Sequence, residues 1–121
     1  MLQIVPGFEH DTVAIVASGV VSGDDYEQLL LPVIEEKLKD HASIRFWYEF
    51  GQDFKGMSVG ALWDDAMLGL FHLSDFSRIA IIVDDNVMRA FASVLAAMIP
   101  CPVKVFSLAE YDEAKAWFEA A

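Results

Sequence analysis

Hydrophobic positions along the chain change period several times, and each change marks a predicted element. Two short apolar runs of β type come first, "LQIV" (Leu2–Val5) and "TVAIVASG" (Thr12–Gly19), and the stretch "PGFEHD" separates them. Apolar runs joined by a short segment with proline and glycine predict a β-hairpin. We therefore expect the chain to begin with two antiparallel strands.

The next segment changes to the period of a helix. Its apolar positions form one stripe at helical spacing, namely Tyr26, Leu29, Leu30, Val33, Ile34 and Leu38. Ser22 precedes the stripe and Asp25 follows three positions later, which predicts a capping box at the start of the helix. Pro32 lies well inside the pattern, where it removes a backbone hydrogen bond and is expected to kink the helix.

Strand and helix patterns then alternate to the end of the chain. The predicted strands are Ser43–Phe50, Arg78–Asp85 and Pro102–Phe106, and the predicted helices are roughly Ser58 to Asp75, "DNVMRAFASVLAAMI" and the segment from Ser107 onward. The stretch "GQDFKG" after the first of these strands is expected to be a loop. This order predicts an α/β fold with a mixed five-stranded sheet and about four helices. No linker divides the chain, so we expect residues 1–121 to form one domain.

Two of the predicted helices are more apolar than packing on a sheet requires. In the second helix Val59, Leu62, Ala66, Leu70 and Leu73 share one face, and further apolar residues lie around a second sector. The third helix repeats this pattern with Arg89 as its only charge. The second sector must be buried on another helix, on a subunit, around a ligand or against a membrane. As ligand-binding candidates we select Met57, Trp63, Met67, Leu68, Phe71, Met88, Phe91 and Leu95.

Charge and composition narrow the range of partners. The net charge of −11 repels phosphate backbones and anionic lipid headgroups. We therefore expect no nucleic-acid partner, whereas neutral apolar molecules stay compatible with this charge. The single cysteine, Cys101, excludes an intrachain disulfide, and its apolar neighbours favour an inert core thiol. Without a signal-peptide pattern or a long apolar run, the chain is expected to be soluble and cytoplasmic.

No motif makes a strong catalytic case. The histidines His10, His41 and His72 fall on three different elements and lack the spacing of metal ligands. "GMSVG" matches the pattern G-x-S-x-G, but that motif needs a strand leading directly into the turn and later Asp and His partners. A predicted loop intervenes here, and His72 is the only histidine after Ser58. We therefore expect no enzyme and no cofactor or metal.

Three stretches carry a resemblance to a known family. They are "SGVVSGDDYEQLLLPVIEEKL", "IRFWYEFGQDFKGMSVGALWDDAMLGLFHLSDFSRIAIIVDD" and "VKVFSLAEYDEAKAWF". They resemble the SpoIIAA-like branch of the STAS superfamily in D-Y-x-x-L-x-P, F-x-G and the terminal E-A-x-x-W. The resemblance implies a sheet with helices on one side, similar also to the CRAL-TRIO lipid-binding fold. It also implies binding of small apolar ligands or association with membranes, and no enzymatic activity.

Ser58 is a candidate phosphorylation site within this resemblance. The anti-sigma antagonists of the superfamily carry a phosphorylatable serine in a D-S-S-G-like turn before the second helix, and Ser58 in "KGMSVG" is the nearest position here. The aspartate and the paired serine are missing. A serine at a predicted helix start is explained better as an N-cap.

These observations lead to one preferred function and one alternative. We expect a non-enzymatic domain that binds a small apolar or lipid-like ligand between the second and third helices, with weak peripheral membrane contact as a further expectation. The alternative is a protein-partner module in a regulatory switch of anti-sigma-antagonist type. Because the chain offers limited room to hide two strongly apolar helices, we also expect a homo-oligomer, with a dimer as the commonest solution.

Overall fold

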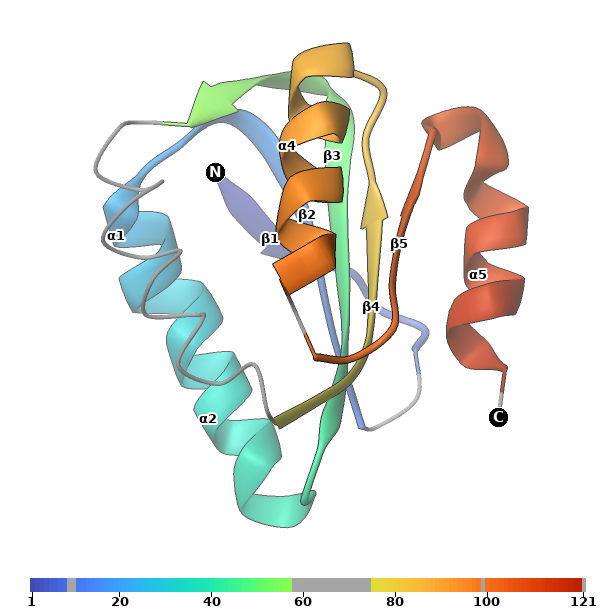
Figure 1. The fold of residues 1–121 in the computed structure, drawn as a ribbon. Coiled ribbons are helices and arrows are strands. Elements are labelled where there is room, and N and C mark those ends of the chain that lie inside the picture. The colour runs from blue at the N-terminus through green and yellow to red at the C-terminus, as the bar shows by residue number, and fades with distance from the viewer. Residues whose placement is uncertain (9–10, 58–74, 99, 121) are drawn as a thin grey trace.

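The fold is built on one mixed sheet. A computed structural model describes residues 1–8, 11–57, 75–98 and 100–120. Within them a five-stranded sheet follows the order of the chain: β1 (Leu2–Ile4), β2 (Thr12–Val21), β3 (Ile44–Met57), β4 (Phe76–Ile82) and β5 (Val103–Phe106) (Figure 1). β1 pairs with β2 in antiparallel fashion, and every later neighbour pairs in parallel. The predicted mixed α/β sheet and its opening hairpin are confirmed.

Helical segments follow β2, β4 and β5. They are α1 (Gly23–Asp25), the π-helical η1 (Tyr26–Leu30), α2 (Leu31–Asp40), α4 (Asn86–Met98), the 3₁₀ segment η4 (Leu108–Glu110) and α5 (Tyr111–Glu119). Met88 of α4 and Ile34 of α2 pack on one face of the sheet. Phe118 of α5 packs on the other face, so the helices lie on both sides (Figure 1).

The expectation of helices on one side only is therefore wrong for α5. Side chains of a strand alternate between the two faces of a sheet. Trp47 and Ala80 are both fully buried and point away from the face that α2 and α4 cover. These apolar residues need a cover of their own, and α5 provides it.

The first helical segment begins as its sequence predicts. The backbone N–H of Ser22 donates to Oδ2 of Asp25 at 2.8 Å, and the N–H of Asp25 donates to the hydroxyl of Ser22 at 3.4 Å. This is the predicted capping box. Pro32 is the second residue of α2, which follows directly after the π-helical η1. The irregularity expected from the proline is thus a local π segment, which is one of the ways a helix accommodates a break in its hydrogen bonding.

The core under α2 and α4 is aliphatic and aromatic. Its buried members include Val13, Ile15, Ala17, Val21, Leu30, Ile34, Ile44, Tyr48, Phe50, Ile79 and Val83. The predicted stripe of the first helix supplies Leu30 and Ile34, which are at most 4% exposed. The helical period of the sequence therefore identified the face of this helix that meets the sheet.

The core under α5 is closed by aromatic rings and by two arginines. The ring of Trp47 lies 5.3 Å from that of Phe118, between their centroids. On the neighbouring strands, Arg45 Nη1 donates to the carbonyl of Phe118 at 2.7 Å, and Arg78 Nη1 donates to that of Trp117 at 2.7 Å. The last carbonyls of a helix lack partners within the helix and carry partial negative charge. At the end of α5, the two guanidinium groups donate hydrogen bonds to these carbonyls and place positive charge next to them.

The expectation of a loop over "GQDFKG" is wrong. β3 continues through it to Met57, because β2 also runs on to Val21 and offers a partner strand. The pairing is irregular, with register shifts on both sides of Gly19, and Gly56 has a φ of +140° that favours glycine. Glycine and charged residues gave this segment the composition of a loop, although tertiary pairing holds it as a strand.

Candidate functional site

Half of the predicted ligand-binding residues lie outside the described part of the chain. Those in the predicted second helix are Trp63, Met67, Leu68 and Phe71, and the candidate phosphorylation site Ser58 lies there too. For Met57, Phe91 and Leu95 the structure describes the backbone, at the end of β3 and within α4, and not the side chain. Met88 is described fully: it is half-buried and packs against the core.

Helix α4 has an inner face and an outer face. Met88 and Ala92 point inward, whereas Val87 and Val94 are 75% and 63% exposed. Arg89 turns back toward the sheet, where its Nη1 donates to the carbonyl of Val83 at 3.0 Å. The outer face of α4 therefore presents apolar side chains, whereas Arg89, the one charged residue of this helix, does not lie on that face.

β3 and β4 separate at the carboxyl edge of the sheet, at the top of Figure 1. Their pairing ends at Glu49 and Ile82, after which β3 continues beside β2 alone. The gap holds a hollow of about 320 Å³, which we call the carboxyl-edge hollow. Its described lining is Phe50, Gly51, Gln52, Phe54, Val83, Asp84, Asp85 and Leu108. Ligands of open parallel sheets commonly bind outside the carboxyl ends of the strands.

Aromatic rings form the β3 side of this hollow. The ring of Phe50 stacks on that of Tyr48 with centroids 4.4 Å apart, and it meets the ring of Phe54 edge-on at 4.7 Å. Phe50 is buried, whereas Phe54 is only partly buried and packs against the core. Phe54 is therefore the aromatic side chain of the hollow that a bound molecule can reach most easily.

Two carboxylates also line this hollow. Oδ1 of Asp84 accepts the backbone N–H of Leu108 at 2.7 Å, and Oδ1 of Asp85 accepts that of Val87 at 3.0 Å. Asp85 thereby caps the start of α4, as expected for an acidic residue at a helix start. Asp84 connects the end of β4 to the start of η4, which lies 24 residues further along the chain.

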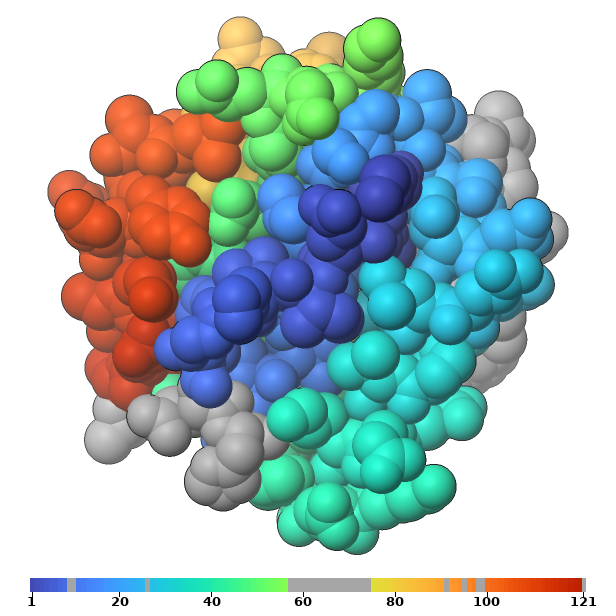
Figure 2. All heavy atoms as spheres, turned by 180° about the vertical axis from the view of Figure 1, so that it is seen from behind, coloured from blue at the N-terminus to red at the C-terminus, as the bar shows by residue number. Residues whose placement is uncertain are grey.

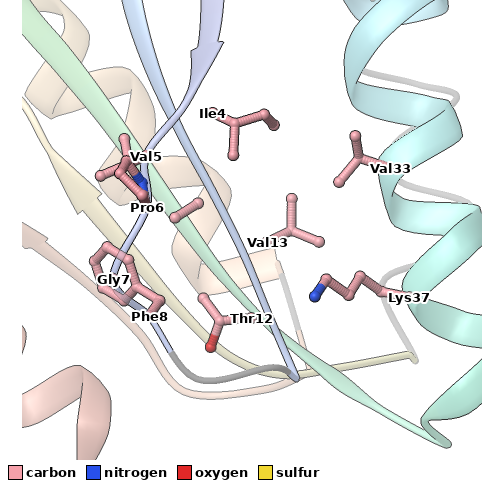
Figure 3. Close-up of a pocket in the computed structure, with 10 residues that line it drawn as sticks. Ile4, Val5, Pro6, Gly7, Phe8, Thr12, Val13, Val33 and Lys37 are labelled. Carbon is pink, nitrogen blue, oxygen red and sulfur yellow. The ribbon is translucent and has the colours of Figure 1, made fainter.

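A smaller hollow of about 170 Å³ lies beside the hairpin. In Figure 2 the residues of β1 and the turn after it lie between α5 and α2. Figure 3 shows Val33 and Lys37 of α2 pointing toward Ile4 and Val13 across this hairpin hollow. Its lining is mostly apolar, but its size is below the usual range for small-molecule sites.

The described residues contain no group of three metal-ligating side chains. His41 lies with Nδ1 3.1 Å from the carbonyl of Lys37, at the end of α2, while His10 and His72 lie outside the described residues. Burial raises the pKa of the Cys101 thiol, which disfavours the reactive thiolate. Within the described part of the chain, each helix is too short or too polar to cross a lipid bilayer.

The sheet order, the parallel strands and the crossover helices define an α/β domain of STAS type. The model of the SpoIIAA-like family matches residues 12–119, and the chain belongs to this family. A solved structure with 28% sequence identity and a TM-score of 0.78 is an uncharacterized DUF3478-family protein with a SpoIIAA-like fold from Shewanella loihica PV-4. That similarity covers 97% of this chain and 93% of the other. No curated protein matches the chain.

The described lining of the carboxyl-edge hollow shares no residue with the predicted set. Sequence reasoning placed Phe50, Asp84 and Asp85 at the ends of two predicted strands, and it placed Phe54 in a loop. The signal that connects them is tertiary, because Phe54 joins the site only when β3 continues past Glu49.

Proposed function

We propose that the protein is a non-enzymatic binding domain for a small apolar or lipid-like ligand, and that the carboxyl-edge hollow receives it. One observation carries the proposal: the aromatic hollow of about 320 Å³ where β3 and β4 separate. This volume lies at the lower end of the range for small-molecule sites. Membership of the SpoIIAA-like family supports a binding role, since this is the function that the resemblance implies.

The hollow also lies at the start of α4, one of the two helices of the predicted site. Asp85 stands immediately before α4. A ligand seated over Phe54 would therefore lie near the start of α4.

The test is uptake of an uncharged fluorescent dye such as Nile red. Phe54→Asp introduces a charge into the hollow at a partly exposed position, so we expect dye uptake to fall strongly while circular dichroism stays unchanged. Ile4→Asp in the hairpin hollow, where Ile4 is 48% exposed, is the matched control and should leave uptake unchanged. Unchanged uptake in Phe54→Asp contradicts the proposal, as does loss of uptake only in Ile4→Asp.

Homodimerisation and weak peripheral membrane contact are part of the same proposal. The exposed valines of α4 support the expectation that apolar surface remains to be covered. Sedimentation at high protein concentration and co-sedimentation with vesicles of phosphatidylcholine test the two expectations separately. The anti-sigma-antagonist alternative depends on Ser58 and stays a prediction from the sequence.

A further inference from the structure

Charge is distributed unevenly around the carboxyl-edge hollow. Asp84 and Asp85 are exposed and line it, while its described lining includes no lysine, arginine or histidine. Each carboxylate uses Oδ1 for a backbone N–H. No described residue donates a hydrogen bond to Oδ2 of either aspartate, so both oxygens remain for a ligand.

The aromatic rings of the hollow also favour a positively charged ligand. The face of a phenyl ring carries partial negative charge and attracts cations, most strongly where water is excluded. Phe54 lines the same hollow as the two aspartates, and its ring meets that of Phe50 edge-on. A positively charged group in the hollow would be attracted by the two carboxylates and by the ring of Phe54, and an apolar group attached to it would cover the ring.

Anions and metal ions fit this hollow less well. The start of a helix attracts anions, but Asp85 already occupies the start of α4 with its own carboxylate. The net charge of −11 further lowers the local concentration of anions. Hard metal ions prefer six or more oxygen ligands, whereas half of this lining is apolar or aromatic.

We propose that the ligand of the carboxyl-edge hollow is an organic cation, with a protonated or quaternary nitrogen next to Asp84 and Asp85 and an apolar or aromatic body over Phe50 and Phe54. This rests on the proposed function and specifies its ligand class. A fatty acid, the other common lipid-like molecule, has the wrong charge for the two carboxylates.

The experiment compares three molecules with the same phenylbutyl body: 4-phenylbutylamine, 4-phenylbutanol and 4-phenylbutyrate. Binding to the full chain is measured by calorimetry and by NMR shift changes at low ionic strength. We expect the amine to bind about tenfold more tightly than the alcohol, from ring and carboxylate contacts together, and the butyrate to bind most weakly. The backbone amides of Gly51 and Gln52 should shift with the amine.

Asparagine variants separate the two carboxylates from the charge of the whole molecule. Asp84→Asn and Asp85→Asn keep an oxygen for the backbone N–H and remove one charge each, so the fold should persist. Each should weaken the amine several-fold and leave the alcohol unchanged. Asp112→Asn, at an exposed position of α5, removes the same charge outside the hollow and should change neither.

Failure of the inference and failure of the proposed function give different results. If the alcohol binds as tightly as the amine and Phe54→Asp abolishes the binding of both, the hollow binds apolar ligands but the cation is wrong. An amine preference that persists in both asparagine variants also overturns the inference, since net charge alone would explain it. If Phe54→Asp changes the binding of none of the three molecules, the proposed function fails.

Discussion

Helices α4 and α5 lie on opposite faces of the same sheet and are held in different ways. α5 buries Ala114 and Phe118 completely, and two arginines bind its last carbonyls. α4 leaves Val87 and Val94 mostly exposed. The comparison indicates that α5 mainly stabilises the fold, whereas α4 keeps apolar surface beyond what the sheet requires.

The two helices also differ in their polar anchoring. α5 follows a capping box at the start of η4, in which the N–H of Ser107 donates to Glu110 Oε1 at 2.9 Å. Arg78 adds a bond to the carbonyl of Ala120 at 2.7 Å, and its guanidinium lies 5.0 Å from the ring centre of Trp117. Both ends of the segment from η4 to α5 are therefore satisfied by specific side chains, which leaves little freedom for α5 to move.

The largest effect is expected at the centre of the α5 face. Trp47 is fully buried, with the rings of Phe8, Tyr111 and Phe118 centred 5.0, 5.4 and 5.3 Å away. Trp47→Ala should lower the free energy of unfolding by about 3–5 kcal/mol, because it leaves a large cavity. Denaturant unfolding followed by circular dichroism measures this. A loss below about 1 kcal/mol, the size of an average substitution, contradicts the structural role of the α5 face.

Removing an arginine from the end of α5 should have the next largest effect. Arg78→Met keeps much of the apolar stem but removes the bonds to two carbonyls, and we expect a loss of about 1.5–3 kcal/mol. Lys39→Met is the control: it breaks an exposed pair with Glu36 at 3.3 Å, which should contribute little. Equal losses in the two variants would show that Arg78 does not anchor α5.

Because Arg45 and Arg78 share the carbonyl of Ala120, their effects should not add. The double variant Arg45→Met/Arg78→Met should lose an amount of unfolding free energy that differs from the sum of the two single losses by at least about 0.5 kcal/mol. Such a difference is typical of neighbouring residues with a common partner. The same unfolding measurement on the three variants completes the cycle. Simple additivity would mean that the two arginines act independently.

The capping boxes predict a dependence of stability on acid. Hydrogen bonds from Ser107 lower the pKa of Glu110 from its usual 4.5. Burial acts to raise the pKa of Asp25, but bonds from Ser22 and the terminal ammonium outweigh it and lower that pKa from 3.8. A carboxylate whose pKa is lower in the folded than in the unfolded state stabilises the fold at any pH above its unfolded-state pKa. This contribution is lost as the pH falls through its folded-state pKa. Glu110→Gln should therefore reduce the slope of stability against pH below about pH 4.5. Identical slopes in variant and wild type would contradict this.

The smallest effect is expected on the outer face of α4. Val94→Ser should change the free energy of unfolding of the monomer by no more than about 0.5 kcal/mol, since the side chain is mostly exposed. Thermal unfolding at low protein concentration measures it. A loss of about 2 kcal/mol, typical of a buried valine, would mean that this face is covered and that the contrast with α5 does not hold.

The sequence by itself determined the elements and their order. Helical and strand periods, capping residues and β-branched runs are local signals, so the stripe with Ile34, the boxes at Ser22 and Ser107 and the buried strand before Asp84 were all predictable. The resemblance to the SpoIIAA-like family then indicated how these elements are arranged in a fold, because the family's motifs lie on the predicted elements.

Only the tertiary structure decided which face α5 covers, how far β3 extends and where the hollow forms. The segment Gly51–Gly56 has the composition of a loop, but the pairing of β2 with β3, which continues to Val21 and Met57, holds it as a strand. The bond from Leu108 to Asp84 spans 24 residues, and no local pattern encodes it. These features depend on contacts between segments distant in the chain, whose free energy comes from burial and pairing in three dimensions rather than from the propensity of any one segment.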